Sequence, residues 1–176
     1  LIRVVVVDDH PLFREGVLYT LRADTGIQVI GEAQSAAEAV RLAQEHLPDI
    51  VLLDLNIPGG GLFAARAIAA ACPVTRIIVL TVSENEDDLV EALKAGARAY
   101  VLKGVGGKEL VNVVNAVQNG EVYVAPTLAA NLLVEMTRAP HAQNPLDELT
   151  ERERQILELV ASGATNREVG LRLHLA

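Results

Sequence analysis

The stretch "PDIVLLDLNIPGGG", residues 48–61, joins an apolar run to an acidic residue and a glycine-rich turn. Its apolar run does not alternate with polar residues, which is typical of a strand buried on both faces of a parallel sheet. Asp54 stands at the end of this strand. Pro58 and the glycines that follow allow the backbone to bend closely around a small anion. The stretch therefore predicts a carboxylate held on a rigid support at the edge of a sheet.

Further runs rich in Val, Ile and Leu recur along the chain, separated by segments of helical spacing. The apolar runs lie at residues 2–9, 27–33, 76–82 and 97–103, and two of the helical segments at 11–23 and 36–47. Strands that alternate with helices indicate parallel βαβ units with helices on both faces of the sheet. We therefore predict an α/β fold, a doubly wound five-stranded parallel sheet in the order 2-1-3-4-5.

Helix signals outline the domain. Ser35 and Ser83 are each followed three residues later by glutamate, a pattern that predicts two helix N-termini. Asn119 and Gly120 predict the end of the last helix, because glycine adopts the left-handed conformation easily. We expect the first domain to span residues 1–120.

The remainder of the chain changes in character. Residues 121–149 are expected to form a linker with one helix, which Pro126 opens before a hinge rich in proline and polar residues. Residues 150–176 show the pattern of two helices joined by a short turn. Fewer than about 40 residues rarely build an independent core, so this last segment is expected to be an incomplete domain.

Composition narrows the class of protein. The chain has 176 residues, 51% of them hydrophobic, and a formal net charge of −8, which goes against a protein that coats nucleic acid or anionic membrane. No apolar run approaches the roughly 18 residues of a membrane span, and the N-terminus lacks a signal-peptide pattern. We expect a cytoplasmic protein. Its four histidines show no ligand spacing, so imidazole is not expected to bind a metal.

Three acidic residues are expected to meet at one edge of the sheet. In a parallel sheet of this order, ligands bind beyond the carboxyl ends of the first and third strands. Asp8 and Asp9 end the first strand, and Asp54 ends the third. Carboxylates so close together require a cation or a proton, and ligation by oxygen alone favours a hard ion. We therefore predict a Mg²⁺ site that is open to a phosphate.

Two further residues end neighbouring strands at the same edge. Thr81 closes the fourth strand with a hydroxyl, and Lys103 closes the fifth with an ammonium. A phosphoryl group in transfer spreads negative charge over its oxygens, and a metal, a lysine and a hydroxyl can stabilise that charge. Asp54 is then expected to act as the nucleophile that becomes an aspartyl phosphate.

The order and spacing of these residues resemble the phosphoacceptor receiver domain, a flavodoxin-like fold, of two-component response regulators. The likeness covers roughly residues 2–120. It implies that Asp9 ligates Mg²⁺ directly, that Asp8 does so mainly through water, and that Asn56 offers its backbone carbonyl. Thr81 and Tyr100 resemble the switch pair of the family, in which the aromatic ring follows the hydroxyl inward.

The family pattern also limits what two other positions do. Gly104 stands where many receivers have proline. His10 is interpreted as a residue that shapes the loop beside Pro11, because the resemblance places the phosphodonor histidine on a separate kinase.

The stretch "LTERERQILELVASGATNREVGLRL", residues 149–173, resembles the first helices of a LuxR-type helix-turn-helix. Together with "DDHP", "GARAYVLKG" and "GEVYVAP", it is similar to the NarL/FixJ class of regulators. The resemblance implies that the recognition helix, which reads bases, would follow the segment given, so we expect a chain truncated before it. Asn166 and Arg167 are candidate contacts to the DNA backbone.

The resulting hypothesis is a response regulator in which phosphorylation of Asp54 switches a DNA-binding output domain, with transcription as the controlled process. The resemblance implies a sensor histidine kinase as phosphodonor, DNA as a partner of the full-length protein, and a homodimer as a further assembly; no membrane partner is expected. Such a protein acts by a population shift and is not an enzyme.

Two alternatives remain. A phosphohydrolase of the haloacid dehalogenase kind also uses an aspartate at a strand end and Mg²⁺, but it needs a second aspartate two residues later, where this chain has Asn56. A flavodoxin-like cofactor binder could share the sheet order. Against it, the chain has no Trp and no phosphate-binding loop rich in Ser and Thr after the first strand.

Overall fold

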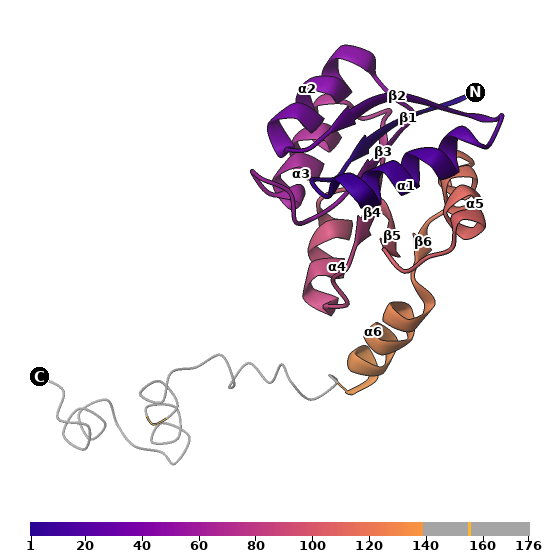
Figure 1. The fold of residues 1–176 in the computed structure, drawn as a ribbon. Helices are drawn as coiled ribbons and strands as arrows, with labels where there is room; N and C mark the ends of the chain where they lie inside the picture. The colour runs from indigo at the N-terminus through magenta and orange to yellow at the C-terminus, as the bar shows by residue number, and fades with distance from the viewer. Residues whose placement is uncertain (139–154, 156–176) are drawn as a thin grey trace, which may run out of the picture. The chain divides into compact units, whose positions relative to one another are not determined.

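One parallel sheet covered by helices on both faces forms the centre of the protein, as the sequence predicts (Figure 1). The computed structural model describes residues 1–138 and residue 155. The sheet order is β2-β1-β3-β4-β5-β6, and every neighbouring pair is parallel. The strands are β1 (Ile2–Val7), β2 (Ile27–Ala33), β3 (Ile50–Leu53), β4 (Arg76–Thr81), β5 (Ala97–Leu102) and β6 (Tyr123–Val124).

The sixth strand corrects the prediction of a five-stranded sheet. β6 pairs with β5 through Ala99 and Tyr100, and the backbone N–H of Ala125 donates to the carbonyl of Tyr100 at 3.0 Å. Two residues are too few to show a period in sequence, so no pattern could reveal this strand. The segment expected to be a linker therefore begins as part of the sheet, and the compact unit extends to Asn131.

Helices cover the two faces of the sheet in separate groups (Figure 1). α1 and α5 pack together against one face, and α2, α3 and α4 follow one another across the other. The helices are α1 (Pro11–Arg22), α2 (Ala36–His46), α3 (Gly61–Ala71), α4 (Glu86–Lys94), α5 (Gly107–Gln118) and α6 (Pro126–Arg138). No helix in the described part of the chain combines the length and the apolar character that crossing a bilayer requires.

The central strands are buried on both faces, which explains their unbroken apolar runs. All four residues of β3 are buried, as are residues 4–7 of β1. Val6, Leu52 and Leu80 lie in the core between the sheet and the α1/α5 pair, whose own contribution includes Leu18 and Leu110. Packed strands of this kind hold the groups at their carboxyl ends in fixed positions.

The predicted N-terminus of α2 is confirmed. Ser35 is its N-cap, and its hydroxyl accepts the backbone N–H of Glu38 at 3.3 Å. The carboxylate of Glu38 in turn accepts the backbone N–H of Gln34 at 2.8 Å. The pattern around Ser35 therefore works as a reciprocal cap.

The same prediction is wrong for Ser83. α4 begins at Glu86, and its N-cap is Asn85, whose side chain accepts the backbone N–H of Asp87 at 2.8 Å. The hydroxyl of Ser83 instead bonds the carboxylate of Asp88. Asparagine caps helices as well as serine does, so two candidate caps two residues apart compete, and sequence spacing does not decide between them.

Two further predictions agree with the structure: a helix that ends near residue 120 and a helix that begins at Pro126. α5 ends at Gln118, and Gly120 adopts a φ of 91°, a left-handed conformation that suits glycine. Pro126 is the first residue of α6. The two helices expected within residues 150–176, with Asn166 and Arg167, lie outside the described residues.

Candidate functional site

Adjacent strands bring the first and third carboxylates side by side. β1 and β3 are neighbours in the sheet, and Val7 is in register with Leu53. Asp8 and Asp54 directly follow these two residues, and the backbone N–H of Asp54 donates to the carbonyl of Val7 at 3.0 Å. The two carboxylates are therefore fixed by the pairing of their strands. Both side chains are almost fully buried, with 4% of Asp8 and 1% of Asp54 exposed.

Lys103 connects these two carboxylates. It follows β5, and its Nζ lies 2.8 Å from Asp8 Oδ2 and 2.8 Å from Asp54 Oδ2. Burial alone would lower the pKa of Lys103, but the hydrogen bonds and charges of Asp54 and Asp8 outweigh it and raise the pKa above its ordinary value. Lys103 is therefore a charged ammonium inside the site.

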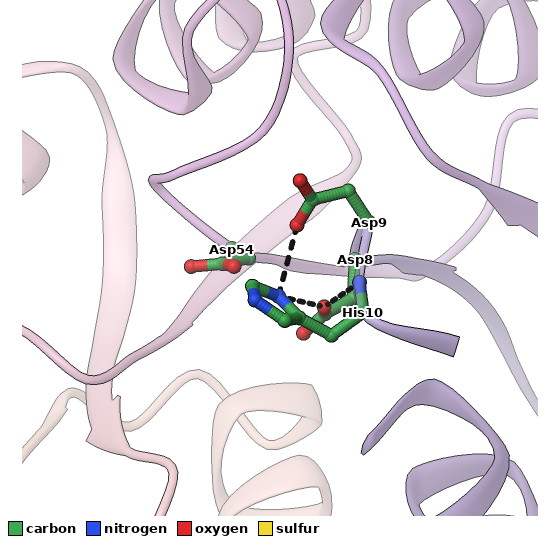
Figure 2. A group of neighbouring side chains, drawn as sticks. All are labelled: Asp8, Asp9, His10 and Asp54. Atoms are coloured by element: carbon green, nitrogen blue, oxygen red, sulfur yellow. Dashed lines mark hydrogen bonds and ion pairs between the residues drawn. The ribbon is translucent and has the colours of Figure 1, made fainter. Parts of the chain in front are cut away.

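Asp9 and His10 lie beside this pair (Figure 2). One ligand atom from each of Asp8, Asp9, His10 and Asp54 can be chosen so that all lie within 4.8 Å of one another. His10 Nδ1 lies 3.0 Å from Asp9 Oδ1 and 3.3 Å from Asp8 Oδ1. Oxygen and nitrogen atoms gathered so closely have the composition of a metal-binding cluster.

The loop between β3 and α3 closes tightly beneath Asp54. Gly59 and Gly60 both have a φ of 88°, in the left-handed region that favours glycine. A Cβ atom on Gly61 would overlap the backbone of Asp54 and Leu55. The glycine run therefore allows the chain to turn back against the acidic residue. In this loop the backbone N–H of Asn56 donates to Asp54 Oδ1 at 3.2 Å.

Thr81 ends β4 and Tyr100 lies within the neighbouring strand β5, and neither side chain is hydrogen-bonded to the carboxylates of the site. Both are fully buried. The hydroxyl of Thr81 accepts the backbone N–H of Ser83 at 3.2 Å, and the hydroxyl of Tyr100 donates to the carbonyl of Ser83 at 3.0 Å. Burial, partly offset by the hydrogen bond at Ser83, raises the pKa of Tyr100, so this hydroxyl is a neutral donor. The two residues are thus linked through one loop.

The charge of the cluster suits a divalent cation. Three carboxylates against the single ammonium of Lys103 leave two negative charges, which one divalent ion would neutralise. Asp9 Oδ1 is a buried atom that has no hydrogen-bond donor among the described residues. An unsatisfied buried oxygen and an excess of negative charge both fit an acidic metal site.

Phe13 is a site residue that the sequence did not indicate. Its ring lies below the ammonium of Lys103, with Nζ 4.6 Å from the ring centroid, a distance suited to a cation–π contact. Phe13 lies in the first turn of α1, and an aromatic residue there looks like an ordinary core residue in sequence. Its contact with Lys103, the residue that follows β5, is visible only in the tertiary structure.

Two family models match the chain. The model described as "Response regulator receiver domain" matches residues 4–115, and the model described as "Bacterial regulatory proteins, luxR family" matches residues 147–176. The second match includes the segment with Asn166 and Arg167.

Relatives and solved structures agree with these models. The response regulator GacA of Pseudomonas aeruginosa is 37% identical over 92% of this chain and 76% of its own length. The DNA-binding transcriptional activator DevR/DosR of Mycobacterium tuberculosis is 35% identical over 100% of this chain and 82% of its own.

Among solved structures, a LuxR-family two-component response regulator from Aurantimonas is similar with a TM-score of 0.73 and 37% identity, covering 77% of this chain and 97% of that one. The signal receiver domain of the response regulator NarL from Mycobacterium tuberculosis is similar with a TM-score of 0.66 and 38% identity, covering 68% and 98%. The chain therefore belongs to the two-component response regulators that control transcription by combining a receiver domain with a LuxR-type DNA-binding domain.

Proposed function

We propose that Asp54 is the phosphoacceptor of this response regulator and that Asp8, Asp9 and the backbone carbonyl of Asn56 hold Mg²⁺ beside it. The observation that carries the proposal is the position of Lys103, whose ammonium lies 2.8 Å from both Asp8 and Asp54. A buried carboxylate with a cation on one side and further carboxylates on the other is suited to receive a phosphoryl group. Mg²⁺, when bound, would neutralise the phosphoryl oxygens.

The chain's own residues direct the transfer. An oxygen of Asp54 attacks the phosphorus, and the bond from phosphorus to the nitrogen of a kinase phosphohistidine breaks, so that the imidazole leaves. Before transfer, Lys103 holds the Asp54 carboxylate. After transfer, its ammonium pairs with a phosphoryl oxygen, and Thr81 offers its hydroxyl to another. The buried position of Asp54 keeps its orientation fixed throughout.

The response to phosphorylation passes through the loop that follows β4. Thr81 and Tyr100 share Ser83 as a partner, since one accepts its N–H and the other donates to its carbonyl. If the Thr81 hydroxyl turns toward a phosphoryl oxygen, its bond to the Ser83 N–H is lost and the loop rearranges. α4 follows this loop directly, and Asp88 in its first turns bonds Ser83. The α4 surface is thus the expected output of the switch.

DNA, a sensor histidine kinase and a homodimer complete the proposal. Residues 147–176 match the luxR family model, which supports a DNA-binding output. Asn166 and Arg167 within this segment are proposed contacts to the DNA backbone, where side chains fix position and not base sequence. Phosphorylation would change the availability of this segment for DNA or for a second copy of the chain.

A phosphohydrolase remains the main competing activity, and one residue distinguishes it. Such an enzyme needs a proton-shuttling acid two residues after the nucleophile, where the amide of Asn56 cannot serve. Family membership favours the regulator over both this enzyme and the flavin binder.

Incubation of the chain with Mg²⁺ and a small phosphodonor such as acetyl phosphate tests the assignment. We expect intact-mass spectrometry to show one added phosphoryl group, which Asp54→Asn abolishes because an amide is not a nucleophile for phosphorus. Asp9→Asn should require a much higher Mg²⁺ concentration for the same labelling. Rapid release of phosphate would instead favour the phosphohydrolase.

Asp87→Asn is the matched control for these variants. Asp87 is an exposed carboxylate in the first turn of α4, outside the cluster of carboxylates at the strand ends. Its substitution removes the same charge and should leave labelling unchanged. If Asp54→Asn still incorporates the phosphoryl group at the wild-type level, Asp54 is not the acceptor.

A further inference from the structure

We propose that His10 is an additional ligand at this metal site. Its imidazole shifts the preference of the site toward a borderline transition ion such as Zn²⁺, compared with a site of three carboxylates alone. The inference rests on the proposed function, since it uses the same carboxylates as the Mg²⁺ site. It adds the imidazole to the site and, with it, a second class of metal ion.

The side chain of His10 contacts the carboxylates of Asp8 and Asp9 and does not cap the helix that it precedes. His10 is the N-cap of α1, but its side chain makes no cap hydrogen bond. The turn is held instead by the Asp8 side chain, whose Oδ1 accepts the backbone N–H of His10 at 2.8 Å. The side chain is 66% exposed. An imidazole with these contacts can adjust its position at little cost in packing.

The position of Nδ1 matches that of a ligand atom beside the carboxylates. Two ligand atoms about 2.1 Å from one ion lie about 3.0 Å apart at a right angle and about 3.4 Å apart at a tetrahedral angle. His10 Nδ1 lies 3.0 Å from Asp9 Oδ1 and 3.3 Å from Asp8 Oδ1. Figure 2 shows the imidazole next to the carboxylates of Asp8 and Asp9, joined to each by a dashed line, with Asp54 beside it. The spacing suits atoms that share an ion, as it also suits a direct ion pair between a protonated His10 and the two carboxylates.

Asp9 Oδ1 also lacks a partner, although the Asp9 side chain as a whole is 32% exposed. This atom is buried and has no hydrogen-bond donor among the described residues, although His10 Nδ1 is only 3.0 Å away. The approach of the ring therefore does not suit a hydrogen bond to this oxygen. Unsatisfied buried oxygens are uncommon in proteins, and an ion between the oxygen and a neutral imidazole would satisfy both.

A nitrogen ligand changes which metals the site favours. Mg²⁺ takes oxygen ligands, whereas imidazole suits Zn²⁺, Ni²⁺ and Cu²⁺. With His10, the set becomes three carboxylates and one imidazole, and its affinity should rise toward the later transition ions. Without His10, the same carboxylates form an all-oxygen site, which suits hard ions such as Mg²⁺. The histidine therefore sets selectivity without being required for Mg²⁺.

Spacing between histidines could not reveal such a site. The expectation that imidazole binds no metal depended on comparing the four histidines with one another. Here a single histidine joins aspartates, one of which comes from another strand. These side chains lie close together only because β1 and β3 are paired in the sheet.

Calorimetric titration of the full chain with ZnCl₂ and, separately, with MgCl₂ tests the proposal. We expect His10→Gln to weaken Zn²⁺ binding by about tenfold or more, as loss of a group that supports a metal typically does, while Mg²⁺ affinity changes by less than about twofold. Zn²⁺ should also shift the imidazole NMR resonances of His10. Excess Mg²⁺ should compete with Zn²⁺, because both ions need the same carboxylates.

His46→Gln is the matched control. His46 is an exposed histidine at the end of α2, and its loss removes an imidazole without touching the carboxylates. Zn²⁺ affinity should remain at the wild-type level in this variant.

Three results would overturn the inference: Zn²⁺ affinity unchanged in His10→Gln, equal weakening of Zn²⁺ and Mg²⁺, or Zn²⁺ binding that excess Mg²⁺ does not reduce. Each of these leaves the phosphoacceptor proposal intact as long as Mg²⁺ binds and Asp54 is labelled. Failure of Mg²⁺ binding and of labelling in the wild-type chain would instead contradict the proposed function.

Discussion

Lys103 balances charges that the fold forces together. Its ammonium contacts both Asp8 and Asp54, and only 10% of its side chain is exposed. The ring of Phe13 lies against the same ammonium. A buried cation between two carboxylates stabilises them mutually, so removal of the cation leaves two uncompensated negative charges.

Lys103→Met should therefore lower the free energy of unfolding in the absence of metal by about 3 kcal/mol. Added Mg²⁺ should restore part of this loss, because an ion that binds the folded chain stabilises it. Mg²⁺ should also bind more tightly to the variant, since a positive charge beside the ion is gone. Urea unfolding with and without MgCl₂ measures both effects.

Lys94→Met provides the comparison. Lys94 forms an exposed ion pair with Glu91, and such pairs contribute little to stability. A stability loss in Lys103→Met no larger than in Lys94→Met would show that the buried carboxylates do not depend on the ammonium.

The raised pKa of Tyr123 should make the free energy of unfolding depend on pH. Burial, together with its hydrogen bond to Glu109 at 2.7 Å, raises the pKa of Tyr123 to about 12. Because the folded pKa lies above the unfolded value, the contribution is fully present below pH 10 and is lost as the pH rises toward 12. The stability difference between wild type and Tyr123→Phe should therefore shrink between these values, measured as urea midpoints. Glu109→Gln should weaken this pH dependence. A stability difference between wild type and Tyr123→Phe that stays constant from pH 10 to 12 would contradict the prediction.

The loop between β3 and α3 can lie close to the sheet because its glycines have no side chains. Gly61 begins α3, and any side chain there would overlap the backbone of Asp54 and Leu55. The sequence indicated a close bend from the glycine run. It could not show that Gly59 and Gly60 are needed for their positive φ whereas Gly61 is needed for a close backbone contact, because that contact depends on which backbone lies opposite.

Gly61→Ala should destabilise the protein by about 3 kcal/mol, since the added methyl group forces the loop away from β3. The same shift should slow labelling of Asp54. Gly104→Ala is the control, because a Cβ at Gly104 meets nothing within 4 Å. Thermal unfolding of both variants decides the matter, and equal midpoints would show that the loop relaxes without cost.

The start of α4 shows a second limit of local patterns. Ser83 followed by Glu86 and Asn85 followed by Asp87 are both acceptable caps in sequence. The structure uses Asn85 and leaves Ser83 to contact Tyr100 and Asp88. A residue that looks like a cap therefore links Thr81 and Tyr100 to the helix instead.

The first compact unit reaches Asn131, and Leu128 is a buried residue of its part beyond residue 120. Leu128 in α6 is 1% exposed, and β6 precedes it at the edge of the sheet. We expect Leu128→Ala to lower the free energy of unfolding by about 3 kcal/mol, because it leaves a cavity against the core.

Leu133→Ala tests the opposite case in the same helix. Leu133 is 63% exposed, so its truncation should change stability little. Calorimetric unfolding of the full chain would compare the two. Equal, small effects would show that the chain beyond residue 120 does not contribute to the cooperative unit.

The sequence by itself determined the α/β class, the first five strands and the identity of the residues that follow them, because these follow from local runs and from the rule that parallel strands end at one edge. Only the tertiary structure decided that Lys103 joins Asp8 to Asp54, that Phe13 and His10 belong to the same cluster, and that a sixth strand completes the sheet. The physical reason is that each of these depends on contacts between segments distant along the chain. Local periodicity records which face a residue buries, but not which partner lies against it.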